Sequence, residues 1–253
     1  MKRTIPMAAL LTAAAQLAGA ADTAPAAPEP ANGSKTTLIV NGLYGLLPND
    51  FDETRTITMF AEEGTIESAY SAKGGPGFEV AVQRLIKPRL AIVIGGGYAS
   101  RSMENDFTAR LPHPLYLNRH RVVEGTSDGF SYTELAGHLS LAYVRTESKM
   151  GYTLFGGPSL YKVDAELVSR IETTEAYPYD EVTARLVTEK QGKTAPGFHV
   201  GGSLSRAMNP KLSIGLQLRY GIGTAKIELN DKDEATKVKA GGLQIGLGLR
   251  FAL

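Results

Sequence analysis

The last eleven residues, LQIGLGLRFAL (243–253), decide the fold class of this chain. Large apolar side chains occupy every second position of this stretch, and the positions between them hold Gln, Gly, Arg or Ala. A period of two places alternate side chains on opposite faces of a β-strand. The stretch KLSIGLQLRYGIG (211–223) repeats the pattern after Pro210. Each run is about 11 residues long, which is the length that a tilted strand needs to cross a bilayer.

The second face of these strands and the connections between them separate a membrane barrel from a soluble sandwich. The second face carries Gly, Ser, Ala, Gln and isolated charges, as a crowded polar lumen requires. Short connections at 87–89, 146–149 and 209–211 alternate with long ones at 49–73, 101–129 and 165–195. Short periplasmic turns and long extracellular loops are typical of bacterial outer-membrane barrels.

The alternating segments number eight, at about 36–47, 76–86, 89–100, 130–145, 151–163, 196–208, 211–228 and 238–253. The sequence therefore predicts an all-β protein, an eight-stranded antiparallel up-and-down transmembrane β-barrel whose closure leaves no edge in lipid. Two local features modify this scheme. Gly156-Gly157-Pro158 predicts a β-bulge, because proline lacks a ladder donor. The alternation of Val182, Ala184, Leu186 and Thr188 predicts that strands in the third long loop extend above the membrane as a hairpin.

The N-terminal region has the pattern of an export signal. Lys2 and Arg3 precede an Ala/Leu-rich segment that ends in Ala18-Gly19-Ala20, which predicts a signal peptide over 1–20. The Pro/Ala-rich segment 21–35 shows no apolar periodicity and is interpreted as a flexible periplasmic leader. The barrel is expected to occupy 36–253, with the mature protein in the bacterial outer membrane.

Composition excludes several classes of function. The chain has 253 residues and no cysteine, which rules out a disulfide scaffold, a thiolate metal site and a cysteine nucleophile. Its 27 Lys and Arg balance 26 Asp and Glu, which argues against a nucleic-acid partner. No cofactor is expected. His113 and His120 share one loop but lack a supporting carboxylate pattern, so no metal site is predicted.

Aromatic residues provide an independent test, because membrane barrels carry aromatic girdles at both interfaces. They are expected at the ends of the strands and not at their centres. The long-loop ends hold Phe78, Tyr98, Phe198 and Tyr220, and the short-turn ends hold Tyr143, Tyr152 and Phe251.

The same alternation predicts which polar side chains enter the lumen. They are Glu79, Gln83, Glu134, His138, His199, Gln217, Arg219 and Arg250. Eight strands leave an interior that side chains can fill, and charges of both signs there are expected to pair. A plug that stabilises the barrel is the first interpretation, and a narrow gated pore is the alternative.

These features together resemble the OmpA/OmpX-type outer-membrane β-barrel domains, over roughly residues 36–253. In that family the last strand commonly ends in an aromatic residue that the barrel-assembly machinery reads, whereas this chain ends in Leu253 with Phe251 two positions earlier. The resemblance implies contact with outer-membrane lipid and lipopolysaccharide, and assembly through the C-terminal strand. It also implies a structural or surface-interaction role, such as adhesion, with extracellular ligands at loops 49–73, 101–129 and 165–195.

An enzyme is the third alternative. His138-Leu139-Ser140 resembles the His-x-Ser arrangement of outer-membrane lipid A deacylases, with Glu134 or Glu147 as a third member. The same face carries Ala136 and Ala142 and is therefore expected to line the lumen, whereas a lipid-cleaving site must reach the bilayer. The sequence accordingly favours a protein without catalysis.

Overall fold

The computed structural model describes residues 35–46, 49–227 and 236–253 of the 253. The predicted signal peptide and all of the predicted leader except Lys35 lie outside the described residues. Nowhere in the described ranges is there a helix long and apolar enough to cross a membrane.

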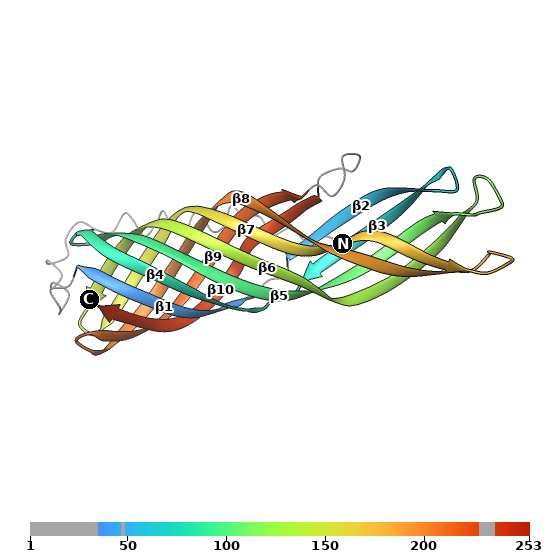
Figure 1. The fold of residues 1–253 in the computed structure, drawn as a ribbon. Helices are drawn as coiled ribbons and strands as arrows, with labels where there is room; N and C mark the ends of the chain where they lie inside the picture. Colours follow the sequence, from blue (N-terminus) through green and yellow to red (C-terminus); the bar gives the residue numbers. More distant parts are fainter. Residues whose placement is uncertain (1–34, 47–48, 228–235) are drawn as a thin grey trace, which may run out of the picture.

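Ten strands run through the described residues (Figure 1). In chain order they are β1 (Thr36–Gly45), β2 (Asn49–Met59), β3 (Glu62–Ala72), β4 (Pro76–Lys87), β5 (Leu90–Pro112), β6 (His120–Glu147), β7 (Met150–Glu175), β8 (Val182–Asn209), β9 (Leu212–Ile227) and β10 (Thr236–Ala252).

Eight of these strands close into a ring. Each pairs with the next in the order β1, β4, β5, β6, β7, β8, β9 and β10, and every pairing is antiparallel. The ring is completed by β10 and β1, whose register runs from Thr37 opposite Ala252 to Gly45 opposite Gln244. The predicted eight-stranded up-and-down barrel is confirmed, and β2 and β3 form an additional hairpin.

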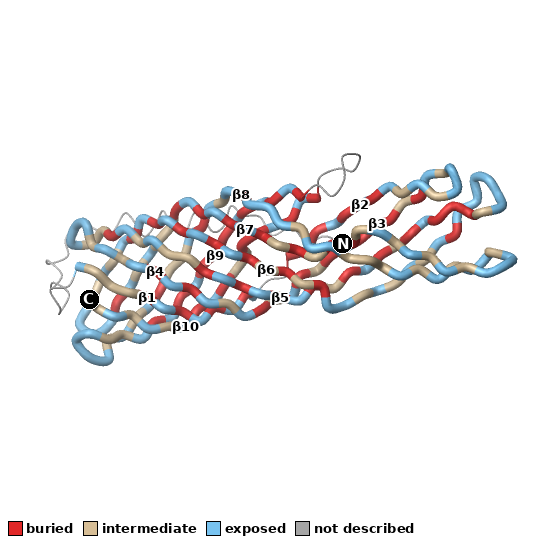
Figure 2. Tube along the Cα trace, viewed as in Figure 1, coloured by how far each residue is buried: buried red, intermediate tan, exposed pale blue. Residues whose placement is uncertain are grey.

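Burial along the barrel strands is the reverse of that in a soluble protein (Figure 2). On β9, Leu216 and Leu218 are exposed on the outer face, while Gln217 and Arg219 are buried on the inner face. On β10, Leu247 and Leu249 are likewise exposed. A continuous belt of exposed apolar side chains is stable only against lipid, so this part of the molecule spans a membrane.

The connections at one end of the barrel are tight, as the sequence predicts. Two residues separate β4 from β5, β6 from β7 and β8 from β9. The predicted bulge at Gly156-Gly157-Pro158 is wrong. The β6–β7 register is the same on both sides of this segment, from His138 opposite Ser159 to Leu141 opposite Gly156. The two pairs between them are missing from the ladder, so proline interrupts the pairing here without inserting an extra residue.

At the opposite end, the segments expected to be long loops are mostly strands. Strands β5 to β8 have 23 to 28 residues, and their outer halves continue the pairing far beyond the barrel. The predicted hairpin above the third connection is confirmed by β7 and β8, which stay paired to Glu175 opposite Val182. The β2–β3 hairpin adds to the outer half of β5. We call this sheet of β2, β3 and the outer halves of β5 to β8 the extension.

The extension has apolar clusters of its own on its inner side. One cluster lies near the barrel and includes Tyr70, Met103, Phe130 and Leu167. The second lies farther out and contains Ile66, Phe107, Ala109 and Leu111. Because these side chains are buried against one another, the extension is a packed structure and not a set of independent loops.

Candidate functional site

The polar side chains inside the barrel form the candidate site. At its centre Glu79 of β4 pairs with Arg219 of β9. The other carboxylate oxygen of Glu79 accepts hydrogen bonds from Asn41 Nδ2 at 3.0 Å and Gln217 Nε2 at 2.9 Å. Arg219 also donates through Nη2 to Oε1 of Gln244 at 2.6 Å. Both charges of this buried pair therefore have further polar partners, which offset the cost of removing them from water.

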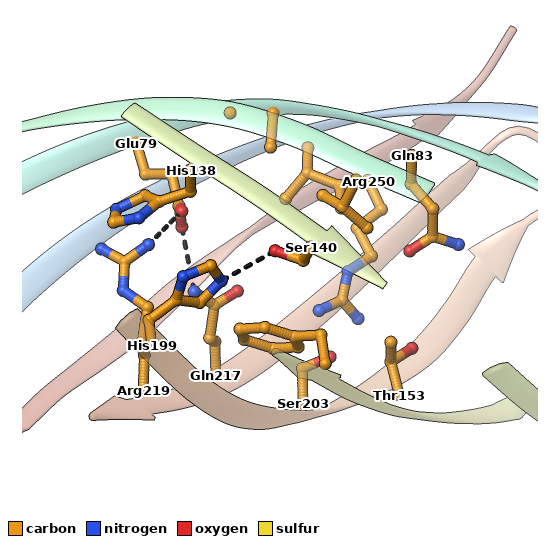
Figure 3. Close-up of a pocket in the computed structure, with 15 residues that line it drawn as sticks. Glu79, Gln83, His138, Ser140, Thr153, His199, Ser203, Gln217, Arg219 and Arg250 are labelled. Carbon is orange, nitrogen blue, oxygen red and sulfur yellow. Dashed lines mark hydrogen bonds and ion pairs between the residues drawn. The ribbon is translucent and has the colours of Figure 1, made fainter. Parts of the chain in front are cut away.

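Beside this ion pair, a chain of hydrogen bonds joins two serines and two histidines. Figure 3 shows the ion pair and, from this chain, His138, Ser140 and His199 with the bond between Ser140 and His199. Ser140 Oγ lies 2.7 Å from Nε2 of His199, and Nδ1 of His199 lies 2.8 Å from Oγ of Ser159. Ser159 Oγ in turn lies 2.9 Å from Nδ1 of His138. The four residues come from β6, β7 and β8, so the chain links three adjacent strands.

The His138, Ser140 and Glu134 arrangement of the enzyme alternative is not assembled. His138 bonds to Ser159, and Ser140 bonds to His199 instead. Glu134 accepts hydrogen bonds from the hydroxyl of Tyr132 and the backbone N–H of Gly241. The alternative third member, Glu147, is exposed and pairs with Arg145 at the end of its strand.

A small cavity remains between these side chains. Its volume is about 30 Å³. Gln83 and Arg250 line it together with His138, Ser140 and His199, and Figure 3 shows the guanidinium of Arg250 directed into it. A space of this size holds about one water molecule. Such a space suits water and not a bulky ligand.

All the sequence-predicted lumen residues lie inside the barrel. Glu79, Glu134, His138, His199, Gln217 and Arg219 are buried, while Gln83 and Arg250 are partly buried. Asn41, Ser159 and Gln244 complete the two networks and were not among the sequence-predicted residues. Each occupies an inward position of the same alternation, so strand parity could have identified them.

A second polar group lies between the barrel and the extension. Arg101 is buried, with its guanidinium carbon 5.7 Å from the centre of the Tyr132 ring and Nη2 donating to the carbonyl of Gly241 at 3.2 Å. Farther out, the hydroxyl of Tyr70 donates to Glu53 at 3.1 Å and accepts from the backbone N–H of Val168 at 2.8 Å. Burial, and then the Glu53 carboxylate, raise the pKa of Tyr70.

The predicted girdle residues all face outward from the barrel. Phe78, Tyr98, Phe198, Tyr220, Tyr143, Tyr152 and Phe251 are exposed. The rings of Phe78 and Tyr98 contact each other across β4 and β5, with centroids 5.9 Å apart. Their position at the lipid interface remains a prediction.

The closed ring and the exposed apolar belt define an eight-stranded antiparallel transmembrane β-barrel. No family model matches the chain, and neither does any curated protein.

Among solved structures, the chain is similar to the outer membrane protein OprG from Pseudomonas aeruginosa, with a TM-score of 0.48, 9% identity, and coverage of 87% of this chain and 96% of that one. It is also similar to Neisserial surface protein A (TM-score 0.40, 11% identity, 87% and 98% coverage). A third similar structure is Ail, the attachment invasion locus protein of Yersinia pestis (TM-score 0.35, 10% identity, 86% and 99% coverage).

Proposed function

We propose that this protein is an outer-membrane barrel with a closed lumen that holds a rigid extracellular sheet for contact with other surfaces or molecules, and that it has no catalytic activity. The observation that carries this proposal is the extension. Strands β5 to β8 are about twice as long as the roughly 11 residues that a membrane crossing needs. Their outer halves pack around apolar clusters, so the chain builds a stable surface outside the barrel.

The lumen supports a closed barrel. Glu79, Arg219, Asn41, Gln217 and Gln244 bond to one another across it. The cavity beside them has a volume of about 30 Å³. Farther out, residues of the extension share one buried apolar cluster with residues at the end of the barrel. Polar side chains bonded in this way favour a plug over an ion path.

The hydrogen bond between Ser140 and His199 is the one observation that favours catalysis, because a nucleophile beside a base is the core of a hydrolase site. The rest of the geometry argues against it. The second ring nitrogen of His199 bonds to Ser159, where a triad would have a carboxylate. Both residues are buried inside the barrel, away from the bilayer.

The remaining partners follow from the fold class. The exposed apolar belt contacts outer-membrane lipid and lipopolysaccharide. We assign recognition by the barrel-assembly machinery to β10, whose last outward residue is Phe251, and to Leu253 directly after it.

Adhesion by cells that display the protein tests the proposal. Cells displaying the full chain should bind to host-cell or abiotic surfaces more than cells displaying a variant with residues 169–188 replaced by a two-residue turn. The matched control carries Glu147→Gln at a periplasmic turn and should adhere like the full chain. Equal adhesion by all three would contradict the surface role.

Two further measurements test the closed lumen and the absence of catalysis. The purified barrel should give no single-channel conductance in planar bilayers, and steady conductance altered by Arg219→Ala would establish the pore instead. Expression should leave the lipid A mass spectrum unchanged. A shift that Ser140→Ala abolishes would establish the enzyme.

A further inference from the structure

The far end of the extension consists of three hairpin turns (Figure 1). They are the β2–β3 turn at 60–61, the β5–β6 connection at 113–119 and the β7–β8 connection at 176–181. Each turn carries at least one large apolar side chain that is exposed to solvent. We call these five residues, Phe60, Leu115, Tyr116, Leu117 and Tyr177, the tip surface.

Exposure of the tip surface is high for side chains of this type. It ranges from 48% for Phe60 to 81% for Tyr177. The neighbouring apolar residues of the extension behave differently, because Ile66, Phe107 and Leu111 are buried in its core. Apolar residues that gather at one end, outside a complete core, mark an interaction site.

Polar contacts hold the three turns together. The backbone N–H of Asn118 donates to Glu62 at 2.8 Å, joining the β5–β6 and β2–β3 turns. Arg119 Nη2 donates to Asp180 at 2.9 Å, joining the β5–β6 and β7–β8 turns. The tip surface is therefore presented by turns that are fixed relative to one another, which lowers the entropy cost of binding.

The residues of the β2–β3 turn make this turn less stable than it could be. Phe60 and Ala61 have φ angles of 52° and 64°, as a two-residue type I′ turn requires. Asn-Gly is the preferred pair for such a turn, and a residue with a Cβ is strained there. A bulky phenylalanine in this conformation and half exposed indicates a role in contact, since it does not favour the turn.

The charges around the tip surface restrict its partner. Arg119 is already paired with Asp180, and Arg121 is buried and paired with Glu175. Glu63 and Glu181 are exposed and have no ion pair among the described residues. The Tyr116 ring already faces the guanidinium of Arg119, whose carbon lies 5.4 Å from the ring centre. Arg110 of β5 is exposed and has no ion pair among the described residues, so the tip offers free carboxylates and one free arginine. Charges of both signs suit a zwitterionic surface better than an anionic one.

We infer that the tip surface binds the face of a lipid bilayer with choline headgroups. Phe60 and Tyr177 leave their rings exposed, and the face of an aromatic ring attracts a quaternary ammonium. Leu115 and Leu117 are 58% and 80% exposed in the β5–β6 connection, and exposed apolar side chains of this kind enter the boundary between headgroups and acyl chains. A folded protein partner would need a separate pocket for each of the three turns, whereas a bilayer accommodates all of them.

This inference rests on the proposed surface role, and vesicle binding tests it separately. The full chain in nanodiscs is immobilised, and vesicles of phosphatidylcholine, phosphatidylethanolamine or phosphatidylglycerol are passed over it. Phosphatidylcholine vesicles should bind best and phosphatidylglycerol vesicles least. Leu117→Ser and Tyr177→Ser should each weaken binding about tenfold, because each removes most of a large apolar contact.

Two variants separate binding from folding. Val122→Ser, on the outer face of β6, removes a comparably exposed apolar side chain near the turns and should leave binding unchanged. The double variant Phe60→Asn with Ala61→Gly should stabilise the turn and still weaken vesicle binding. Equal binding to all three lipids, stronger binding to phosphatidylglycerol, or no vesicle binding would overturn the inference. Loss of vesicle binding with cell adhesion retained would overturn it while leaving the proposed surface role intact.

Discussion

At the scale of single residues, Glu79 is the side chain on which the lumen network depends. It is 5% exposed and accepts hydrogen bonds from Asn41, Gln217 and Arg219. Glu79→Gln leaves the buried guanidinium of Arg219 without its counter-charge. We expect a loss of stability on the order of 3 kcal/mol, the usual cost of breaking a buried ion pair. Urea unfolding followed by circular dichroism measures it, since the chain has no tryptophan to report by fluorescence.

The control for this change is Glu147→Gln. Glu147 pairs with Arg145, but both side chains are about half exposed. Exposed pairs contribute little, so the variant should lose less than about 1 kcal/mol. Equal effects of the two substitutions would contradict a special role for the buried pair.

Tyr70 gives a prediction about pH, also at the scale of a residue. Its pKa is raised because the phenol is buried and faces the Glu53 carboxylate. The folded extension therefore favours the neutral phenol of Tyr70. The stability that this phenol contributes is complete below about pH 10, the pKa of tyrosine in the unfolded chain, and is lost as the pH rises above that value. The free energy of unfolding of the extension, measured by urea denaturation, should fall as the pH rises above about 10.

Tyr70→Phe should reduce this alkaline dependence. It should also make the extension less stable at neutral pH, because the hydrogen bonds to Glu53 and Val168 are lost. An alkaline profile identical to that of the native chain would show that another group controls the transition.

At the scale of the secondary-structure elements, the β2–β3 turn is strained and can be improved. Replacing Phe60 and Ala61 with Asn and Gly supplies the pair that a type I′ turn prefers. We expect the hairpin to gain about 1 kcal/mol, since a non-glycine residue at positive φ costs about that much. Slower exchange of the Met59 and Glu62 amides measures the gain. Exchange at the distant β8–β9 turn should not change.

The elements also show what the sequence could and could not predict. The barrel strands were predictable because one of their faces is uniformly apolar, as in 243–253. In the extension only the hairpin around 182–188 was predictable from its alternation. The segment 101–112 was not, because its buried face mixes Arg101 and Asn105 with Met103 and Phe107. The outer face of the same segment carries charges and hydroxyls, so hydropathy does not alternate there and the segment resembles a loop.

The sequence predicted which residues line the lumen site but not which of them form hydrogen bonds with one another. Strand parity placed His138, Ser140 and His199 in the lumen. His138 and Ser140 are two residues apart on one strand, a separation of roughly 7 Å, whereas neighbours on paired strands are closer. Ser140 therefore bonds across strands to His199. Such pairs depend on register and side-chain direction, which a single sequence does not reveal.

At the scale of the whole molecule, two structures of different chemistry share one set of strands. The barrel has a polar interior and an apolar outside, while the extension has an apolar interior and a charged outside. The change takes place near Arg101 and Glu134, where buried polar side chains separate the lumen network from the apolar clusters. Lipid stabilises the first part, and the hydrophobic effect in water stabilises the second.

This division predicts that the extension can open while the barrel stays folded. Leu167 is fully buried in the extension, and Leu167→Ala should destabilise that part by about 3 kcal/mol through the cavity it leaves. Hydrogen exchange should then accelerate in β2, β3 and the outer halves of β5 to β8, while the heat-dependent gel mobility that reports a folded barrel should stay the same. Glu79→Gln should show the opposite pattern, because the lumen network lies within the barrel. If both variants lowered the stability of both parts equally, the molecule would be one cooperative unit, and the extension would not be an independent surface carried on the barrel.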